Sequence, residues 1–220
     1  MKKLKIGKNI ISQKNKTYFI ADIAASHDGK LSRAKKLIRL AAKAGADAAK
    51  FQNFFADRFI SDFGFKKLGN KLSHQSKWKK SVYDVYKDAE LPLKWTAELK
   101  KTCRSVGIDY FTAPYDLGII NFLNKYVSAW KVGSGDITFH ENILRLAKTK
   151  KVIIIATGAS NLNEVIDVYK KVIKINKKIV IMQCNTNYTA DKKNFSFINL
   201  NVLKKYKKIF PKAILGLSDH

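Results

Sequence analysis

The sequence predicts an α/β fold, a (β/α)8 TIM barrel that is incomplete, with about seven of its eight strands, and that carries an N-terminal hairpin arm. Three observations predict this fold. Strand-like and helix-like segments alternate along the 220 residues. The strand-like segments are apolar on both faces, which is typical of a parallel sheet covered by helices. Polar residues follow the ends of these segments, where a (β/α)8 barrel collects its catalytic groups.

Seven segments are predicted as strands because they are short, apolar and followed by polar residues, glycine or proline. They are residues 18–25, 47–52, 108–113, the first half of 129–138, 152–156, 179–183 and 213–217. Residues 4–12 precede them as a short strand or hairpin arm, with a turn expected at 14–16. No glycine-rich dinucleotide fingerprint follows the first strand, which disfavours a Rossmann fold.

Helices are expected between the strands, where apolar residues recur at helical spacing. They are residues 31–44, 94–106, 116–126, 141–149, 161–175 and 197–209. Gly45 ends the first of these helices, and Ser160 or Asn161 caps the helix at 161–175. Residues 54–92 have no clean periodicity beyond a helical turn or two at 82–89, so we interpret them as a long functional excursion.

The composition is that of a globular protein, with 46% hydrophobic and 11% aromatic residues. Two cysteines, Cys103 and Cys184, provide no disulfide framework and suit a reducing compartment. No apolar run reaches the roughly 18 residues of a membrane span, and no secretory signal follows the basic start. We therefore expect a cytoplasmic protein.

The charge is strongly positive, with 43 Lys and Arg residues against 17 Asp and Glu residues, a formal +26. A nucleic-acid partner is one interpretation of such a charge. Nearly all of the excess is lysine, scattered in pairs over the expected helices, whereas arginine is the preferred reader of phosphate and base edges. We favour solvated helix faces, with nucleic acid bound only non-specifically.

Residues 129–138 contain the clearest candidate binding site. Lys131 lies at the end of a strand and is followed by the glycine-flanked Ser134. The ammonium supplies charge, and the hydroxyl and nearby backbone N–H groups supply directed donors, so the stretch suits a small anion. By itself a Gly-Ser-Gly stretch is more often a tight turn. The site interpretation gains support because the other strands also end in polar residues, namely Asp22, Lys50, Gln52, Thr112, Thr157, Thr186 and Ser218.

Five stretches together resemble the N-acetylneuraminate (sialic acid) synthase family, including its pseudaminic and legionaminic acid relatives. They are Phe-Ile-Ala-Asp-Ile at 19–23 with Ser-His-Asp-Gly at 26–29, Gly-Ala-Asp-Ala-Ala-Lys-Phe-Gln at 45–52, Trp-Lys-Val-Gly-Ser-Gly-Asp at 130–136, Ala-Thr-Gly at 156–158, and Gly-Leu-Ser-Asp-His at 216–220. The stretches occur in order along the whole chain. The set is specific, although no single stretch is.

The resemblance implies a transferase that condenses phosphoenolpyruvate with an N-acetylmannosamine-type sugar and releases phosphate. It implies a divalent metal, Mn²⁺ or alternatively Mg²⁺, that polarises the sugar aldehyde. Family members complete the barrel and add an antifreeze-like domain in a domain-swapped homodimer. We therefore expect residues 1–220 to form one barrel domain that lacks its last βα unit and that domain, and to be inactive alone.

The resemblance also assigns site residues by position. Phosphoenolpyruvate is expected at Lys50, Lys131, Ser134 and Ser218, and the sugar at Gln52, Asp136 and Tyr188. Asp22 stands where the family has a proton-transferring glutamate one methylene longer, and His220 is expected as a metal ligand.

Three positions depart from the family pattern. Ala113 and Ala156 replace phosphate-binding hydroxyls, and Thr186 replaces an asparagine or serine. Their neighbours Thr112, Thr157 and Asn185 could substitute for them, although a shift of one residue along a strand points a side chain to the other face.

Two other functions compete with the synthase. A barrel-strand lysine can also form an imine, so a lysine Schiff-base aldolase is the alternative enzyme. A basic nucleic-acid-binding or scaffold protein is the alternative outside enzymes. Two roles are open for His27: it either forms a hydrogen bond at the start of a helix or contacts the sugar.

Overall fold

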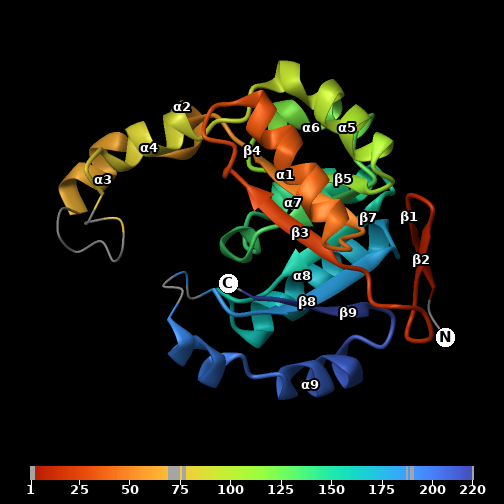
Figure 1. The fold of residues 1–220 in the computed structure, drawn as a ribbon. Helices are drawn as coiled ribbons and strands as arrows, with labels where there is room; N and C mark the ends of the chain where they lie inside the picture. Colours follow the sequence, from red (N-terminus) through yellow and green to blue (C-terminus); the bar gives the residue numbers. More distant parts are fainter. Residues whose placement is uncertain (1–2, 69–74, 76–77, 187, 189–190, 220) are drawn as a thin grey trace. The chain divides into compact units, whose positions relative to one another are not determined.

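The computed structural model describes residues 3–68, 75, 78–186, 188 and 191–219 (Figure 1). The chain divides into two compact units. The early unit is residues 19–127, and the late unit is residues 1–18 together with residues 128–220. Each unit has its own parallel strands and its own helices.

The early unit contains three parallel strands in the order β3-β4-β5. They span Ile20–Ala24, Ala48–Asn53 and Asp109–Pro114. All of β5 and most of β4 are buried, as expected for strands that are apolar on both faces. The register sets Asp22 opposite Lys50 and Gln52 opposite Ala113, so the polar strand ends lie next to one another.

The helices of the early unit follow the amphipathic pattern of the sequence. They are α1 (Leu31–Lys43), α5 (Thr96–Ser105) and α6 (Ile120–Asn124). α1 buries Ala34 and Ile38 and packs against β3 and β4, and it also lies beside α5 (Figure 1). Gly45, with φ of +90°, follows α1 in the left-handed region, which confirms the expected helix end.

The excursion between β4 and α5 is more regular than its sequence indicated. It holds α2 (Ala56–Phe59), α3 (Asp62–Leu68) and α4 (Val82–Asp88). The helical turns expected at 82–89 are confirmed as α4, whose N-terminus is capped by the Ser81 hydroxyl. The other two helices are short and depend on tertiary packing, which a periodicity argument does not detect.

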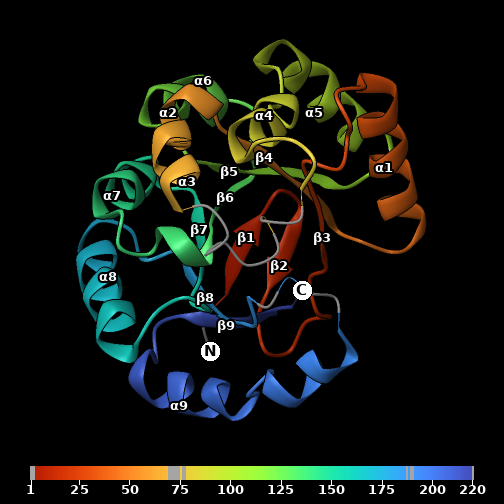
Figure 2. The same cartoon turned by 90° about the vertical axis from the view of Figure 1, so that its left-hand side faces the viewer.

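The late unit contains four parallel strands in the order β6-β7-β8-β9. They span Ala129–Val132, Val152–Ala156, Ile179–Cys184 and Ile214–Ser218. The helices of this unit are α7 (His140–Lys148), α8 (Leu162–Ile175) and α9 (Asn201–Ile209). Figure 2 shows these helices along one side of β7, β8 and β9. Asn161 and Glu164 form a reciprocal capping box at the start of α8, as the sequence indicated.

The N-terminal hairpin is confirmed, but its turn is not at residues 14–16. β1 (Leu4–Ile6) and β2 (Asn9–Ile11) pair antiparallel, with Ile6 opposite Asn9. The two-residue loop between them contains Gly7 at φ of +54°. Glycine adopts this conformation without steric cost, which favours the tighter turn. β1 lies against β7.

Several element bounds differ from those that the sequence predicts, and three of these differences concern how an element ends, divides or begins. β5 continues through Pro114, because the φ of proline suits an extended strand and Tyr115 N then donates to Asn53 O at 2.9 Å. Residues 116–126 form a 3₁₀ turn at Leu117–Ile119 followed by α6 rather than one helix. Residues 192–197 are also 3₁₀, so α9 begins later than expected.

These strands and helices confirm the α/β class of an incomplete (β/α)8 barrel with an N-terminal hairpin. Among the described residues, no helix has both the length and the apolar character needed to cross a membrane.

Candidate functional site

An ion pair joins the ends of β3 and β4. Asp22 and Lys50 are register partners, and Lys50 Nζ lies 2.7 Å from Asp22 Oδ2. The side chain of Lys50 is 7% exposed, whereas that of Asp22 is 40% exposed. A nearly buried ammonium needs a partner, because burial without one is costly. The carboxylate therefore balances the lysine charge when no anionic ligand is bound.

A second polar group lies at the ends of β4 and β5. Gln52 Nε2 donates to the Tyr115 hydroxyl at 3.4 Å. The neighbouring Asn53 side chain is buried, and its Oδ1 accepts a bond from Thr112 Oγ1 at 2.6 Å. Successive residues on a strand point to opposite faces, so the side chains of Gln52 and Asn53 lie in different surroundings. Gln52 is only partly buried, which suits ligand contact, whereas Asn53 belongs to the interior.

His27 lies buried just before α1. Its ring is fully buried, Nδ1 accepts the Gly29 N–H at 3.1 Å, and its edge packs against Trp95 at 5.7 Å. Burial lowers the pKa of His27, partly opposed by the Asp28 charge and the Ala89 backbone. This geometry agrees with the alternative of a hydrogen-bond partner at the helix start.

In the late unit, the stretch that the sequence indicates as a candidate anion site runs from the end of β6 into a 3₁₀ turn at Ser134–Asp136. Lys131 and Ser134 are 9% and 8% exposed. Lys131 Nζ donates to Val132 O at 2.9 Å, and Ser134 Oγ accepts the Gly158 N–H at 3.2 Å. The ends of β6 and β7 are therefore joined through a serine hydroxyl and a backbone amide, the donor types that small anions use.

Asp136 is a titratable group of this stretch whose pKa is strongly shifted. Burial raises the pKa of its carboxyl to about 6, although the Lys131 charge and the Gly133 N–H lower it. Desolvation disfavours the charged carboxylate more than the nearby ammonium stabilises it. A carboxyl with this pKa can hold or release a proton near neutral pH.

The residues that could have replaced the missing phosphate-binding hydroxyls are already engaged. Thr112 donates to Asn53, as described above. Thr157 is buried, and its Oγ1 lies 3.0 Å from Met182 O and 2.9 Å from the Tyr206 hydroxyl. Asn185 Nδ2 donates to Asn194 O at 3.2 Å. These bonds occupy the side chains that lie one position along the strand from Ala113 and Ala156, and their part in ligand binding stays a prediction.

The remaining expected site residues, Ser218, Tyr188 and His220, belong to the late unit by their place in the chain. Ser218 is the last residue of β9, opposite Cys184, and its carbonyl accepts the Asn185 N–H at 3.2 Å. Tyr188 is 61% exposed. His220 lies outside the described residues.

Each unit thus brings together part of the predicted site. Asp22, Lys50 and Gln52 lie at adjacent strand ends of the early unit, and Lys131, Ser134 and Asp136 lie within six residues of the late unit. The convergence of the two groups on one pocket stays a prediction.

Two residues with a direct part in this geometry were not assigned a role from the sequence. Gly158 provides the N–H that donates to Ser134 Oγ. Its place in the Ala-Thr-Gly stretch could have identified it as a site residue. Tyr115 contacts Gln52, and its position directly after a strand-ending proline could have identified it.

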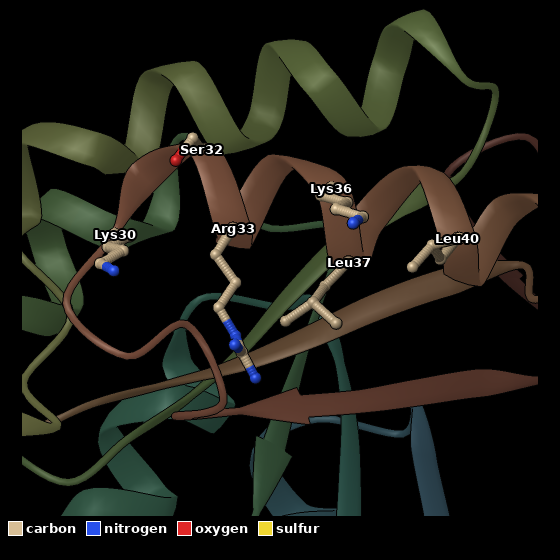
Figure 3. A pocket seen from close by; sticks show the side chains of 6 residues that line it. All are labelled: Lys30, Ser32, Arg33, Lys36, Leu37 and Leu40. Carbon is tan, nitrogen blue, oxygen red and sulfur yellow. The ribbon is translucent and has the colours of Figure 1, made fainter.

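An open groove of about 520 Å³ runs along α1. Lys30, Ser32, Arg33, Lys36, Leu37 and Leu40 line it, and Figure 3 shows Arg33 and Leu37 projecting on the side where β3 runs. Arg33 is engaged by Asp28 at 3.0 Å and by Ser26 O at 2.9 Å. The groove contains none of the expected site residues.

Comparisons with known proteins match most or all of the chain. A family model described as the NeuB family matches residues 37–220. The chain is 35% identical to N,N'-diacetyllegionaminic acid synthase of Campylobacter jejuni, covering 93% of this chain and 61% of that protein. It is 29% identical to human N-acetylneuraminate-9-phosphate synthase, covering 92% of this chain and 55% of that protein.

A solved structure has the same fold. The crystal structure of the spore coat polysaccharide biosynthesis protein spsE from Bacillus subtilis matches with a TM-score of 0.80 and 28% identity. The match covers 100% of this chain and 57% of that chain. The chain thus spans little more than half the length of these relatives.

Proposed function

Because the chain belongs to the NeuB family, we propose that the protein condenses phosphoenolpyruvate with an N-acetylmannosamine-type sugar. The products are a nonulosonic (sialic) acid and inorganic phosphate. The observation that carries this proposal at the site is the pair of nearly buried lysines at strand ends, Lys50 and Lys131, which are 6% and 9% exposed. Buried lysines are seldom found without a paired anion, and here the carboxylates of Asp22 and Asp136 lie near Lys50 and Lys131. Two such ammonium groups at strand ends suit an anionic ligand as well.

Phosphoenolpyruvate provides that anion through its carboxylate and phosphate. Ser134 accepts the Gly158 N–H, which leaves its own hydroxyl proton for a bond to a phosphate or carboxylate oxygen. Lys131 adds charge beside this hydroxyl, and Lys50 and Ser218 are proposed to bind the same ligand. An anion that approaches Lys50 competes with Asp22 for the ammonium, so ligand binding frees the Asp22 carboxylate.

The reaction forms a carbon–carbon bond and a carbon–oxygen bond from water to C2, and it breaks the bond between C2 and the phosphate oxygen. C3 of phosphoenolpyruvate attacks the sugar aldehyde carbon, and the aldehyde oxygen takes up a proton. Water adds at C2 and gives up a proton, and the tetrahedral intermediate then expels phosphate. Two proton-transferring groups are therefore needed. Asp22 and Asp136 are the carboxyl groups that we propose for these transfers and for sugar contact, with Gln52 and Tyr188 also facing the sugar.

A divalent metal, Mn²⁺ or Mg²⁺, is part of the proposal. It would supply Lewis-acid polarisation of the aldehyde. The described residues contain no group of three or more His, Cys, Asp or Glu side chains that could hold a metal ion. His220, the expected ligand, lies outside them. We therefore derive no step through the metal and test it by chelation with EDTA and addition of Mn²⁺ to the phosphate-release assay.

The contacts of the two lysines favour the synthase over a Schiff-base aldolase. An imine-forming lysine must present a neutral amine. Lys50 Nζ is instead paired with the Asp22 carboxylate, and Lys131 Nζ is engaged by Val132 O, so neither amino group is presented alone to a carbonyl substrate. Borohydride trapping with pyruvate separates the two functions, because only the aldolase forms a reducible imine.

The main test is phosphate release from phosphoenolpyruvate with N-acetylmannosamine and Mn²⁺. We would assay the 220-residue chain and the same chain joined to the C-terminal part of the Bacillus subtilis relative. Lys131→Ala should lose about 2–4 kcal/mol of transition-state stabilisation, the effect of removing one preorganised electrostatic contact. Lys174→Ala, which changes an exposed lysine on α8, is the matched control and should leave turnover unchanged. If neither form releases phosphate in a sugar-dependent manner, the proposal is refuted.

A further inference from the structure

The backbone at the ends of β4 and β5 places Tyr115 beside Gln52. Gln52 is the register partner of Ala113, and the bond from Tyr115 N to Asn53 O extends the pairing beyond the last residue of β5. The position of Tyr115 is thus fixed by the ladder rather than by a free loop. Its side chain starts from a rigid point at the same edge as the amide of Gln52.

The ring of Tyr115 is held by other aromatic rings from the excursion. Its centroid lies 4.9 Å from that of Phe59 and 6.2 Å from that of Phe54. Tyr86 packs against both phenylalanines, at 5.5 Å from Phe54 and 5.7 Å from Phe59. Aromatic pairs at these separations favour defined relative orientations. The cluster therefore leaves the Tyr115 ring little freedom.

The next loop residue strengthens this attachment. Asp116 Oδ2 lies 3.1 Å from Arg58 Nη1, and its Oδ1 accepts the Gly118 N–H at 2.6 Å. Arg58 belongs to α2, so the segment after β5 is tied to the helix that follows β4. Both chain segments around Tyr115 are thus anchored.

The Tyr115 hydroxyl lies beside the Gln52 amide and accepts a hydrogen bond from Gln52 Nε2 at 3.4 Å. A glutamine amide carries two N–H donors and one carbonyl acceptor. One N–H directed at a fixed hydroxyl restricts the long side chain and leaves the carbonyl and the second N–H for other bonds. Restricting such a side chain before binding removes part of the ordering entropy that binding would otherwise cost.

We propose that Tyr115 is a positioning residue, which orients the Gln52 amide toward the N-acetylated sugar. The inference rests on the proposed function, because it assigns the sugar contact of Gln52 an orienting partner. Tyr115 acts through Gln52 and has no role in binding phosphoenolpyruvate. Its effect is therefore confined to sugar affinity.

The test removes only the hydroxyl, with Tyr115→Phe. Nuclear magnetic resonance of the side-chain amides reports on Gln52 directly, and Gln52→Glu, which lacks the amide protons, assigns the resonances. We expect Tyr115→Phe to shift the Gln52 amide pair and to weaken N-acetylmannosamine binding about three- to tenfold, the effect of losing one hydrogen bond. The KM for the sugar should rise by the same factor, while kcat and the KM for phosphoenolpyruvate stay unchanged.

Tyr86→Phe is the matched control, because it removes a hydroxyl from the same ring cluster. It should leave both the Gln52 resonances and sugar affinity unchanged. In a double-mutant cycle, Tyr115→Phe should have no further effect on sugar affinity once Gln52 is replaced by alanine.

The outcomes separate this inference from the proposed function. If wild-type protein binds the sugar and Tyr115→Phe binds it equally well, the inference is wrong and the proposed function stands. An equal loss of affinity in Tyr86→Phe would also overturn it, because ring packing and not the hydroxyl would then be responsible. If wild-type protein neither binds the sugar nor releases phosphate, the proposed function fails and this inference fails with it.

Discussion

Replacing Gly158 by alanine should destabilise the late unit and weaken the hydrogen bond from the Gly158 N–H to Ser134 Oγ. A Cβ at this position would lie 2.6 Å from the carbonyl oxygen of Cys184 and 2.6 Å from Cγ2 of Thr186. These distances are far inside van der Waals contact. A threonine side chain can rotate away, but the Cys184 oxygen belongs to the backbone at the end of β8 and cannot.

The expected magnitude follows from how firmly that backbone is held. Cys184 pairs with Ser218 on β9, and the adjoining Asn185 N–H donates to Ser218 O at 3.2 Å. Overpacking against a well-held structure costs about 1–3 kcal/mol. Alanine regains about 0.4–1 kcal/mol because it restricts the unfolded chain. We therefore expect a net loss of about 1–2 kcal/mol in the free energy of unfolding.

Urea denaturation followed by circular dichroism measures this loss. Gly135→Ala is the matched control, because a Cβ there meets nothing within 4 Å. It should leave the free energy of unfolding unchanged or slightly higher. Because Gly158 N donates to Ser134, Gly158→Ala should also raise the Kd for phosphoenolpyruvate. Equal stability of the two variants would refute the steric argument.

Three further predictions concern the late unit. The pKa of Asp136 in the folded protein, about 6, exceeds its unfolded value of 3.8, so its contribution to stability is fully present below pH 3.8 and is lost as pH rises through 6. Relative to Asp136→Asn, the wild type should therefore lose up to about 3 kcal/mol of unfolding free energy between pH 4 and pH 7, measured by urea denaturation, and a pH-independent difference would contradict this. Thr157→Val removes the bond to Tyr206 and should destabilise the protein by about 1–2 kcal/mol in thermal unfolding, with the Kd for phosphoenolpyruvate unchanged; weaker ligand binding would show that Thr157 faces the ligand. Asn161→Ala removes one side of the capping box with Glu164 and should cost about 1 kcal/mol in the same measurement, and no change in melting temperature would mean that the cap is dispensable.

The sequence by itself determined the elements that depend on local patterns. The apolar run at 152–156 is short and rich in β-branched residues, which indicated a buried strand. Gly45 and the Asn161 cap mark helix ends through backbone geometry that nearby residues impose. It also placed Lys131 and Ser134 together, because they are close along the chain. The parallel order of the strands followed from the alternation of strands and helices, since a parallel pair needs a crossover between its members.

Only the tertiary structure decided the contacts between residues far apart in the chain. The pairing of Asp22 with Lys50 depends on strand register, and the contact of Tyr115 with Gln52 depends on a ladder extended past Pro114. The raised pKa of Asp136 depends on burial by the packed unit. Local patterns fix backbone conformation through sterics within a few residues, whereas register, burial and close approach arise when distant segments pack.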